Sequence, residues 1–248
     1  MLRVLCHFLV IMFLTILTQI GGIAWGIALF FRSRILAFIL TYTALSIATI
    51  WVAPNFGRVA LNCFDDGSLQ VQSVIYCALN RNYVSPQLAQ VLIETADAVD
   101  KGFPGAKTLV LDANFPFFDG FPLLPHLSHD DGDKADLAFY YKDENDYLPG
   151  VVRSPIGYFA FEQGPTNCVP KWPTLRWDFK FLQPFWRSYA IEPERNKAVL
   201  QILSDDARVG KIFVEPHLVN ALDVAHPKIR FQGCRAARHD DHIHMQLK

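Results

Sequence analysis

The sequence HDDHIHMQL, residues 239–247, alternates between polar and apolar side chains from His242 to Leu247. Because successive side chains of a β-strand point to opposite faces, the alternation predicts a strand over residues 242–247. His242 and His244 are two positions apart, so they share one face of that strand. The strand therefore offers two imidazole groups side by side, and imidazole nitrogens are common metal ligands.

A second group of histidines lies in the sequence PHLSHDDGDKADL, residues 125–137. His126 and His129 precede an acid-rich turn, in which Gly132 allows the chain to fold back toward a strand that Asp136 would start. Two histidines and one carboxylate form a familiar ligand set for catalytic zinc, whose fourth position is left to water. Either histidine group alone is weak evidence for a metal site, but the two groups together indicate one.

The order and spacing of the two motifs resemble those of a known peptidase family. The motif S-H-x2-G-x3-D begins at Ser128, and the motif H-D-x-H-x-H begins at His239. Together they are similar to the penicillin-insensitive murein endopeptidases, which belong to a wider group with the lysostaphin-type and D-Ala-D-Ala metallopeptidases. The resemblance runs from about residue 107 to the end of the chain and includes residues 212–216 and Arg230.

This resemblance implies which residues would bind the metal. The ligands of a zinc ion would be His129, Asp136 and His244. His126 corresponds to a further family histidine near the metal, whereas His242 would not be a ligand.

Three residues near the last ligand are candidates for catalysis. By the same resemblance, His242 would donate a hydrogen bond to the charge that develops on the amide oxygen or relay a proton, and His239 would be a second such group. Asp241 stands where related dipeptidases place a catalytic glutamate. A regular strand would point Asp241 away from His242, so a catalytic role for Asp241 requires a turn or bulge.

The first 53 residues differ from the rest of the chain in charge. They contain Arg3, Arg32 and Arg34 but neither lysine nor an acidic residue. Without these arginines, the 23 basic residues of the chain fall to 20, against 24 acidic ones. The remainder is therefore acidic overall, which argues against nucleic-acid binding.

Two long apolar runs in this region predict a membrane anchor. Each run exceeds the ~20 residues needed to cross a bilayer, so we expect residues 1–57 to form a transmembrane hairpin with helices at about 4–31 and 35–53. A cleaved signal peptide is less consistent with this length. Arginines in the connection between the two helices favour a cytoplasmic location for that connection. Residues 58–248 would then form a peptidase domain on the periplasmic or outer side of a bacterial inner membrane.

Cysteine usage is consistent with an extracytoplasmic domain. Cys63, Cys77, Cys168 and Cys234 form an even set, as is usual in oxidising compartments. Three pairings are possible, and proximity along the chain favours Cys63 with Cys77 and Cys168 with Cys234.

We expect the soluble part to be an α+β fold, with a small antiparallel sheet and flanking helices that carry the zinc site. Ser85 and Pro86 are typical of a helix start, and apolar residues then recur at helical spacing over residues 86–101. The other expected elements are a hairpin at 59–83, strands at 108–111, 135–141, 211–214 and 242–247, and helices at 196–203 and 216–222.

The sequence thus predicts a membrane-anchored metallopeptidase that uses Zn²⁺ and acts on peptidoglycan peptides. A D-Ala-D-Ala carboxypeptidase is the nearest alternative, and it should need a cation for the product carboxylate. The candidates for that cation are Arg153, Arg176, Arg230 and Arg235. A non-catalytic zinc protein that binds the cell wall is a second alternative, in which His242 or Cys234 would close the metal site.

An aromatic run and two isolated histidines can be explained by structural roles alone. The run is Trp172, Trp177, Phe179, Phe181, Phe185 and Trp186. Core packing is favoured over the alternative that these side chains line a glycan or peptide groove. His217 and His226 are interpreted as ordinary surface or capping residues.

Overall fold

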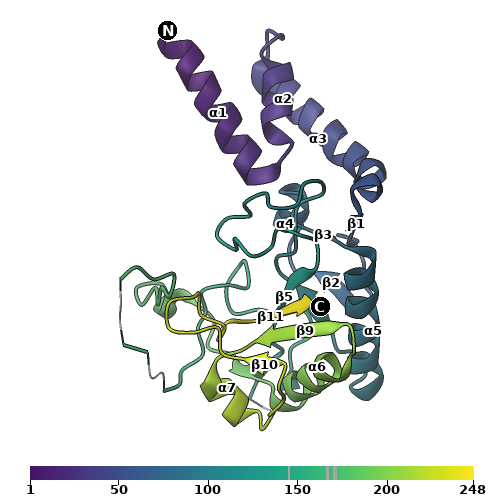
Figure 1. Cartoon of the computed structure of the whole chain (residues 1–248), viewed down its shortest axis with the longest axis vertical. Coiled ribbons are helices and arrows are strands. Elements are labelled where there is room, and N and C mark those ends of the chain that lie inside the picture. The colour runs from purple at the N-terminus through teal and green to yellow at the C-terminus, as the bar shows by residue number, and fades with distance from the viewer. Residues whose placement is uncertain (145, 166–167, 170–171) are drawn as a thin grey trace. The chain divides into compact units, whose positions relative to one another are not determined.

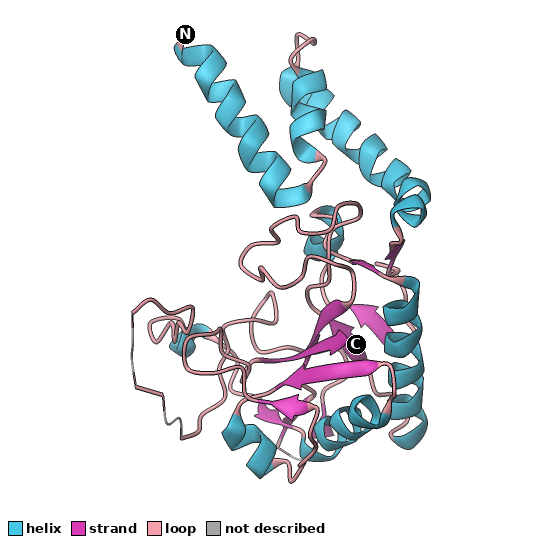
Figure 2. Cartoon of the chain, in the orientation of Figure 1, coloured by secondary structure: helices cyan, strands magenta, loops and turns pink. Residues whose placement is uncertain are grey.

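The computed structural model of the chain describes residues 1–144, 146–165, 168–169 and 172–248 (Figure 1). Helices and strands are mixed along the chain, which confirms the α+β class (Figure 2). Contacts divide the chain into two compact units that alternate along the sequence. The first unit comprises Met1–Cys63, Val74–Ala89 and Asp112–Lys134, and the second comprises Phe64–Ser73, Gln90–Leu111 and Ala135–Lys248.

The first unit begins with helices α1 (Leu2–Thr18), α2 (Gly21–Ala28) and α3 (Arg34–Val52), and a 3₁₀ turn extends α3. Residues Arg34–Phe56 are long and apolar enough to cross a membrane, whereas Leu2–Thr18 is shorter. Large apolar side chains are exposed along both helices, among them Phe13 on α1 and Leu40 on α3. Such exposure is typical of a surface that contacts lipid or another protein.

The expected single helix over residues 4–31 is wrong, because the chain turns between α1 and α2. Gln19 adopts a φ of 62°, a left-handed conformation that ends a helix. The Thr18 hydroxyl then accepts a hydrogen bond from the amide of Gly21, the first residue of α2, at 2.9 Å. A Cβ atom on Gly22 would lie 2.0 Å from the Thr15 hydroxyl, so glycine permits the close approach of the two helices. A hairpin of two spanning helices is therefore not confirmed.

The remaining elements of the first unit are short. Strands β1 (Val59–Ala60) and β3 (Tyr83–Val84) pair antiparallel, and helix α4 (Val74–Ala78) lies between them in sequence. The expected simple hairpin over residues 59–83 is therefore wrong. A disulfide joins Cys63 to Cys77, at the end of α4, as proximity along the chain predicted.

The second unit is built around a six-stranded sheet with the strand order β10-β9-β11-β5-β4-β2. Its strands are β2 (Leu69–Val71), β4 (Thr108–Val110), β5 (Lys134–Ala138), β9 (Val209–Phe213), β10 (Ile229–Arg230) and β11 (His242–Leu247). β2 pairs parallel to β4 and β10 pairs parallel to β9, whereas β4 with β5 and β9 with β11 are antiparallel. The sheet is therefore mixed, and the expected antiparallel sheet is wrong in this respect.

Helices cover the sheet and supply its apolar core. Helix α5 (Pro86–Gly102) has almost the predicted bounds, and it buries Leu88, Val91, Leu92, Ala96 and Val99 completely. Helix α6 (Pro193–Asp205) contacts β9 and buries Leu200. Helix α7 (Pro216–Ala221) follows β9. The sheet with its helices provides the rigid scaffold for the histidines of β11.

A smaller sheet and a second disulfide complete the unit. Strands β7 (Asp146–Tyr147), β6 (Tyr141–Asp143) and β8 (Ala190–Ile191) form an antiparallel three-stranded sheet, and a 3₁₀ turn (η2) spans Gln183–Phe185. The pairing of Cys168 with Cys234 is also as predicted.

Candidate metal centre

Strands β5 and β11 are neighbours in the middle of the six-stranded sheet, and they carry three of the seven predicted site residues. Asp136 lies on β5, and His242 and His244 lie on β11. Each of these three residues is at most 4% exposed. Polar groups buried to this extent require polar partners or a bound ion.

The Asp136 carboxylate lies at the centre of these contacts. Its Oδ1 atom is 2.9 Å from His244 Nδ1, and its Oδ2 atom accepts a hydrogen bond from the Tyr158 hydroxyl at 2.7 Å. His242 Nε2 lies 3.7 Å from the same Oδ2 atom. The contact between Asp136 and His244 has the length of a hydrogen bond, whereas neighbouring ligand atoms of a tetrahedral zinc ion are roughly 3.3 Å apart.

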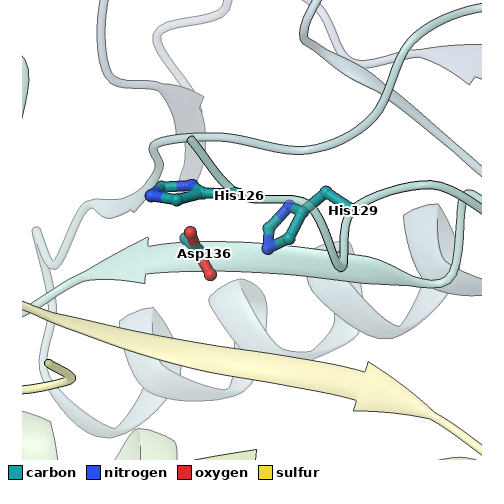
Figure 3. A group of neighbouring side chains, drawn as sticks. All are labelled: His126, His129 and Asp136. Carbon is teal, nitrogen blue, oxygen red and sulfur yellow. The ribbon is translucent and has the colours of Figure 1, made fainter. Parts of the chain in front are cut away.

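His126, His129 and Asp136 form a group that can hold a metal ion. Each residue offers one ligand atom, and these atoms all lie within 4.8 Å of one another. Figure 3 shows both imidazole rings on the loop before β5 and the Asp136 carboxylate on the strand itself. Two of the three predicted zinc ligands, His129 and Asp136, are therefore in this group, together with His126, which the resemblance placed near the metal; the third, His244, is not a member of it.

Each histidine of the loop has a fixed orientation. The Nδ1 atom of His129 lies 2.8 Å from the carbonyl oxygen of Ala113, a contact that places a proton on Nδ1 and leaves Nε2 as the basic nitrogen. Metal-binding histidines typically make this kind of second hydrogen bond. His126 Nδ1 lies 3.2 Å from Oδ2 of Asp112.

Asp112 is in turn held by Arg81. The guanidinium donates to both carboxylate oxygens, with Nε at 2.8 Å from Oδ1. Burial alone would raise the pKa of Asp112, but the charge of Arg81 and the contact with His126 outweigh burial and lower it. The carboxylate therefore stays ionised and favours a fixed orientation of His126. Asp112 was not predictable from the sequence, because a lone aspartate after a strand carries no spacing signal.

The donor set fits a divalent metal ion. Buried imidazole nitrogens and a carboxylate suit a borderline cation that accepts both nitrogen and oxygen ligands. Second hydrogen bonds orient the two loop histidines, as metal sites require. Cys234 is not available as a ligand, because it is bonded to Cys168.

The predicted catalytic residues also lie together. Asp241 precedes β11 in a bend, so its side chain reaches the ring of His242, with Oδ1 2.6 Å from Nδ1. Its Oδ2 atom accepts a hydrogen bond from the Phe159 amide at 2.6 Å. With both oxygens engaged, Asp241 is placed to orient His242.

Phe159 itself adopts a left-handed conformation, with a φ of 65°. Its carbonyl oxygen accepts hydrogen bonds from Gln183 Nε2 at 2.7 Å and from Trp186 Nε1 at 2.8 Å. Left-handed backbone is unfavourable for a bulky side chain, so these hydrogen bonds and the one to Asp241 hold Phe159 in place. The aromatic segment around residue 183 thus supports the residue that contacts Asp241.

His239 is positioned through its backbone. Its ring centroid lies 4.9 Å from that of His242 and 5.7 Å from that of His244. The Glu215 amide donates to the His239 carbonyl at 3.0 Å, and the His239 amide donates to Glu215 Oε1 at 3.3 Å. Arg176 donates to both carboxylate oxygens of Glu215, at 2.8 and 2.7 Å.

Two of the structural interpretations from sequence are wrong. Much of the aromatic run is exposed, with Trp172 at 89% and Phe181 at 70%, so it does not pack as a core cluster. The side chain of His217 is only 6% exposed and lies 3.9 Å from Asp240, so it is not a surface residue. Both interpretations rested on average burial, by which aromatic side chains are mostly buried and histidines are often exposed. These residues depart from that average.

No model of a known protein family matches the chain, and no curated protein is significantly similar to it. The resemblance to the murein endopeptidases therefore stays a prediction from the two sequence motifs.

Proposed function

We propose that the protein is a zinc-dependent peptidase that hydrolyses amide bonds in peptidoglycan stem peptides or their cross-links. One observation carries this proposal: the Asp136 carboxylate groups with His126 and His129 and also lies 2.9 Å from His244. The proposed ligands are His129, Asp136 and His244. The peptidoglycan substrate is inferred from the resemblance of the two motifs to murein endopeptidases.

The ligand set is suited to Lewis-acid catalysis. When bound, zinc supplies a Lewis acid that polarises an amide carbonyl and lowers the pKa of water to about 7. The carboxylate of Asp136 would partly neutralise the charge of a bound ion, and the hydrogen bond from Tyr158 holds that carboxylate in place.

The residues around the ligands would transfer protons and stabilise the charge that develops during hydrolysis. Asp241 accepts a hydrogen bond from His242 Nδ1, which leaves His242 Nε2 as the nitrogen that accepts or donates a proton near Asp136. His239 lies beside His242 and is the second candidate for the proton transfer. We therefore assign Asp241 a positioning role and rank His242 and His239 as the acid–base groups.

The proposed location is the inner membrane of a bacterium, with the peptidase facing the periplasm or the exterior. The apolar segment Arg34–Phe56 supports a membrane anchor. The two disulfides support an oxidising compartment for the rest of the chain.

A D-Ala-D-Ala carboxypeptidase would need a cation for the product carboxylate, and two of the four candidate arginines are already paired with acids. Arg176 is paired with Glu215, and Arg153 donates to Glu162 at 2.6 Å. Arg230 and Arg235 are exposed and stay as candidates. Pairing with buried or half-buried acids makes Arg176 and Arg153 poor ligands for a product carboxylate, which favours the endopeptidase.

Hydrolysis by the purified full-length protein in detergent micelles tests the proposal. The assay uses cross-linked muropeptides and mass analysis of the products, which also identifies the bond that is cut. Activity should be lost on chelation and regained when Zn²⁺ is added. Activity that resists a chelator, or intact muropeptides after incubation with the zinc-loaded protein, would contradict the proposal.

Substitutions separate the ligands from the catalytic groups. His244→Ala and Asp136→Asn should reduce both the bound zinc and the activity. His242→Ala should keep the zinc and lower turnover by roughly 100-fold, as the loss of a transition-state hydrogen bond does. Loss of zinc in His242→Ala would instead support the non-catalytic alternative, in which His242 closes the site.

A further inference from the structure

A cavity of about 510 Å³ lies in the second unit beside the Cys168–Cys234 disulfide. Its wall includes Trp177, Phe179 and Phe181, together with the polar side chains of Thr174 and Asp178. The volume falls in the range of ligand sites, which combine mainly apolar walls with a few polar groups. Trp177 is 47% exposed and Phe181 is 70% exposed, so their rings are accessible to a ligand.

Two chains of contacts connect this cavity to the candidate catalytic residues. Arg176 lines the cavity and binds Glu215, which hydrogen-bonds the backbone of His239. Phe179 packs edge-on against Phe159 at 4.9 Å, and the Phe159 amide donates to Asp241. Two wall residues of the cavity, Arg176 and Phe179, are thus each linked to a candidate catalytic residue through one intervening residue.

The charges around the cavity favour an uncharged ligand. Both arginines among the described residues of its wall are already paired: Arg176 with Glu215, and Arg238 with the fully buried Asp240. Neither guanidinium is available to neutralise a carboxylate of a ligand. The Asp178 carboxylate is 51% exposed and lies 3.6 Å from Lys180, so it can accept hydrogen bonds from hydroxyl or amide groups of a ligand.

We propose that this cavity binds a sugar ring of the glycan strand that carries the substrate peptide. A pyranose ring has apolar C–H faces that stack on aromatic rings, and a rim of hydroxyl groups that hydrogen-bond to groups such as Asp178 and Thr174. The N-acetylated sugars of peptidoglycan meet the requirement for an uncharged ring. The inference rests on the proposed function only for the identity of the substrate.

Binding of a neutral glycan tests the site directly. The probe is the β-1,4-linked tetrasaccharide of N-acetylglucosamine, titrated against the full-length protein in detergent micelles by calorimetry. We expect saturable binding by the wild type, and about tenfold weaker binding by Trp177→Ala and by Phe181→Ala, since each removes a stacking surface. Phe181 is exposed, so its truncation should not affect folding.

Trp172→Ala is the matched control. Trp172 belongs to the same segment and is 89% exposed, but it is not among the described residues of the cavity wall. This variant should bind the tetrasaccharide within twofold of the wild type. If Trp172→Ala weakens binding as much as Trp177→Ala does, or if Trp177→Ala has no effect, the cavity is not the binding site.

A kinetic comparison separates this site from the peptidase proposal. Trp177→Ala should raise KM for a cross-linked muropeptide that keeps its sugars, leave kcat unchanged, and have no effect on the same peptide without sugars. Hydrolysis without tetrasaccharide binding would overturn the sugar site and leave the peptidase. Binding without any hydrolysis would overturn the peptidase and leave the site.

A second small probe distinguishes a sugar site from a site for an apolar peptide side chain. N-acetyl-leucine amide is uncharged and has no sugar ring. If this amide binds in a manner that depends on Trp177 and the tetrasaccharide does not bind, the cavity accepts a peptide side chain and the proposal is wrong.

Discussion

The Nδ1 atom of His242 lies 2.6 Å from Oδ1 of Asp241, its neighbour in the sequence. This contact is possible because Asp241 lies in a bend rather than in the regular part of β11. The second carboxylate oxygen is held by the Phe159 amide. The pair thus resembles the oriented acid–histidine pairs of hydrolases, in which the acid selects one tautomer of the imidazole.

Asp241→Asn should lower turnover on muropeptides by about 100-fold while bound zinc stays unchanged. An asparagine amide can donate as well as accept, so it no longer favours a proton on Nδ1 of His242. Activity assays combined with metal analysis by mass spectrometry measure both quantities. Asp143→Asn, at an exposed position, is the control and should retain full activity. Unchanged turnover in Asp241→Asn would contradict the positioning role.

Glu215→Leu should lower the free energy of unfolding by about 3–5 kcal/mol, because it leaves the guanidinium of Arg176 buried without its carboxylate. The double variant Arg176→Met with Glu215→Leu should recover most of this loss, since it removes both charges. Urea denaturation of the full-length protein, followed by tryptophan fluorescence, gives the comparison. Equal destabilisation of the single and double variants would argue against an unpaired charge as the cause.

The two disulfides should differ in how much they stabilise the protein. The chain-entropy model predicts about 4 kcal/mol for the bridge between Cys168 and Cys234, which are 66 residues apart. For Cys63 and Cys77, 14 residues apart, it predicts about 3 kcal/mol. Paired Cys→Ala variants, compared by urea denaturation, test the order. A larger loss from the short bridge would show that native contacts outweigh chain entropy.

Stability should fall above pH 10, in part because of two buried tyrosines. Burial raises the pKa of both Tyr140 and Tyr141 above 10. The folded protein therefore keeps these protons where the unfolded chain releases them, so the stabilisation is present below pH 10 and decreases as the pH rises. Each group contributes a slope of about 1.4 kcal/mol per pH unit in that window.

A Tyr140→Phe variant checks this assignment. Its unfolding free energy should decrease less steeply between pH 10 and pH 12 than that of the wild type. The hydroxyl of Tyr140 also shares a 2.6 Å hydrogen bond with Thr108, so the variant is compared by slope and not by absolute stability. Identical slopes would show that Tyr140 is ionised in the folded protein.

Local signals in the sequence predicted the parts of the fold that depend on short-range physics. Helix α5 followed from the capping residue Ser85 and helical spacing, and Ser85 Oγ indeed accepts from the Leu88 amide at 3.1 Å. The alternation in residues 242–247 predicted β11 with its bounds. Both disulfides followed from proximity along the chain.

Features that depend on distant contacts were not predictable in this way. Apolar composition cannot reveal the break at Gln19, because both helices flanking it remain apolar. The parallel pairing of β2 with β4 joins segments almost 40 positions apart, and no local pattern encodes it. Tyr158 and Glu215 touch site residues only after the loops fold, so spacing could not identify them.

Phe159 has a consequence for how the protein can evolve toward heat tolerance. Its left-handed backbone would be more favourable for glycine, yet glycine would remove the ring that packs on Phe179. A more stable backbone thus favours glycine at position 159, whereas the ring contact with Phe179 requires phenylalanine there. Lineages that adapt to hotter habitats should gain their stability elsewhere in the molecule.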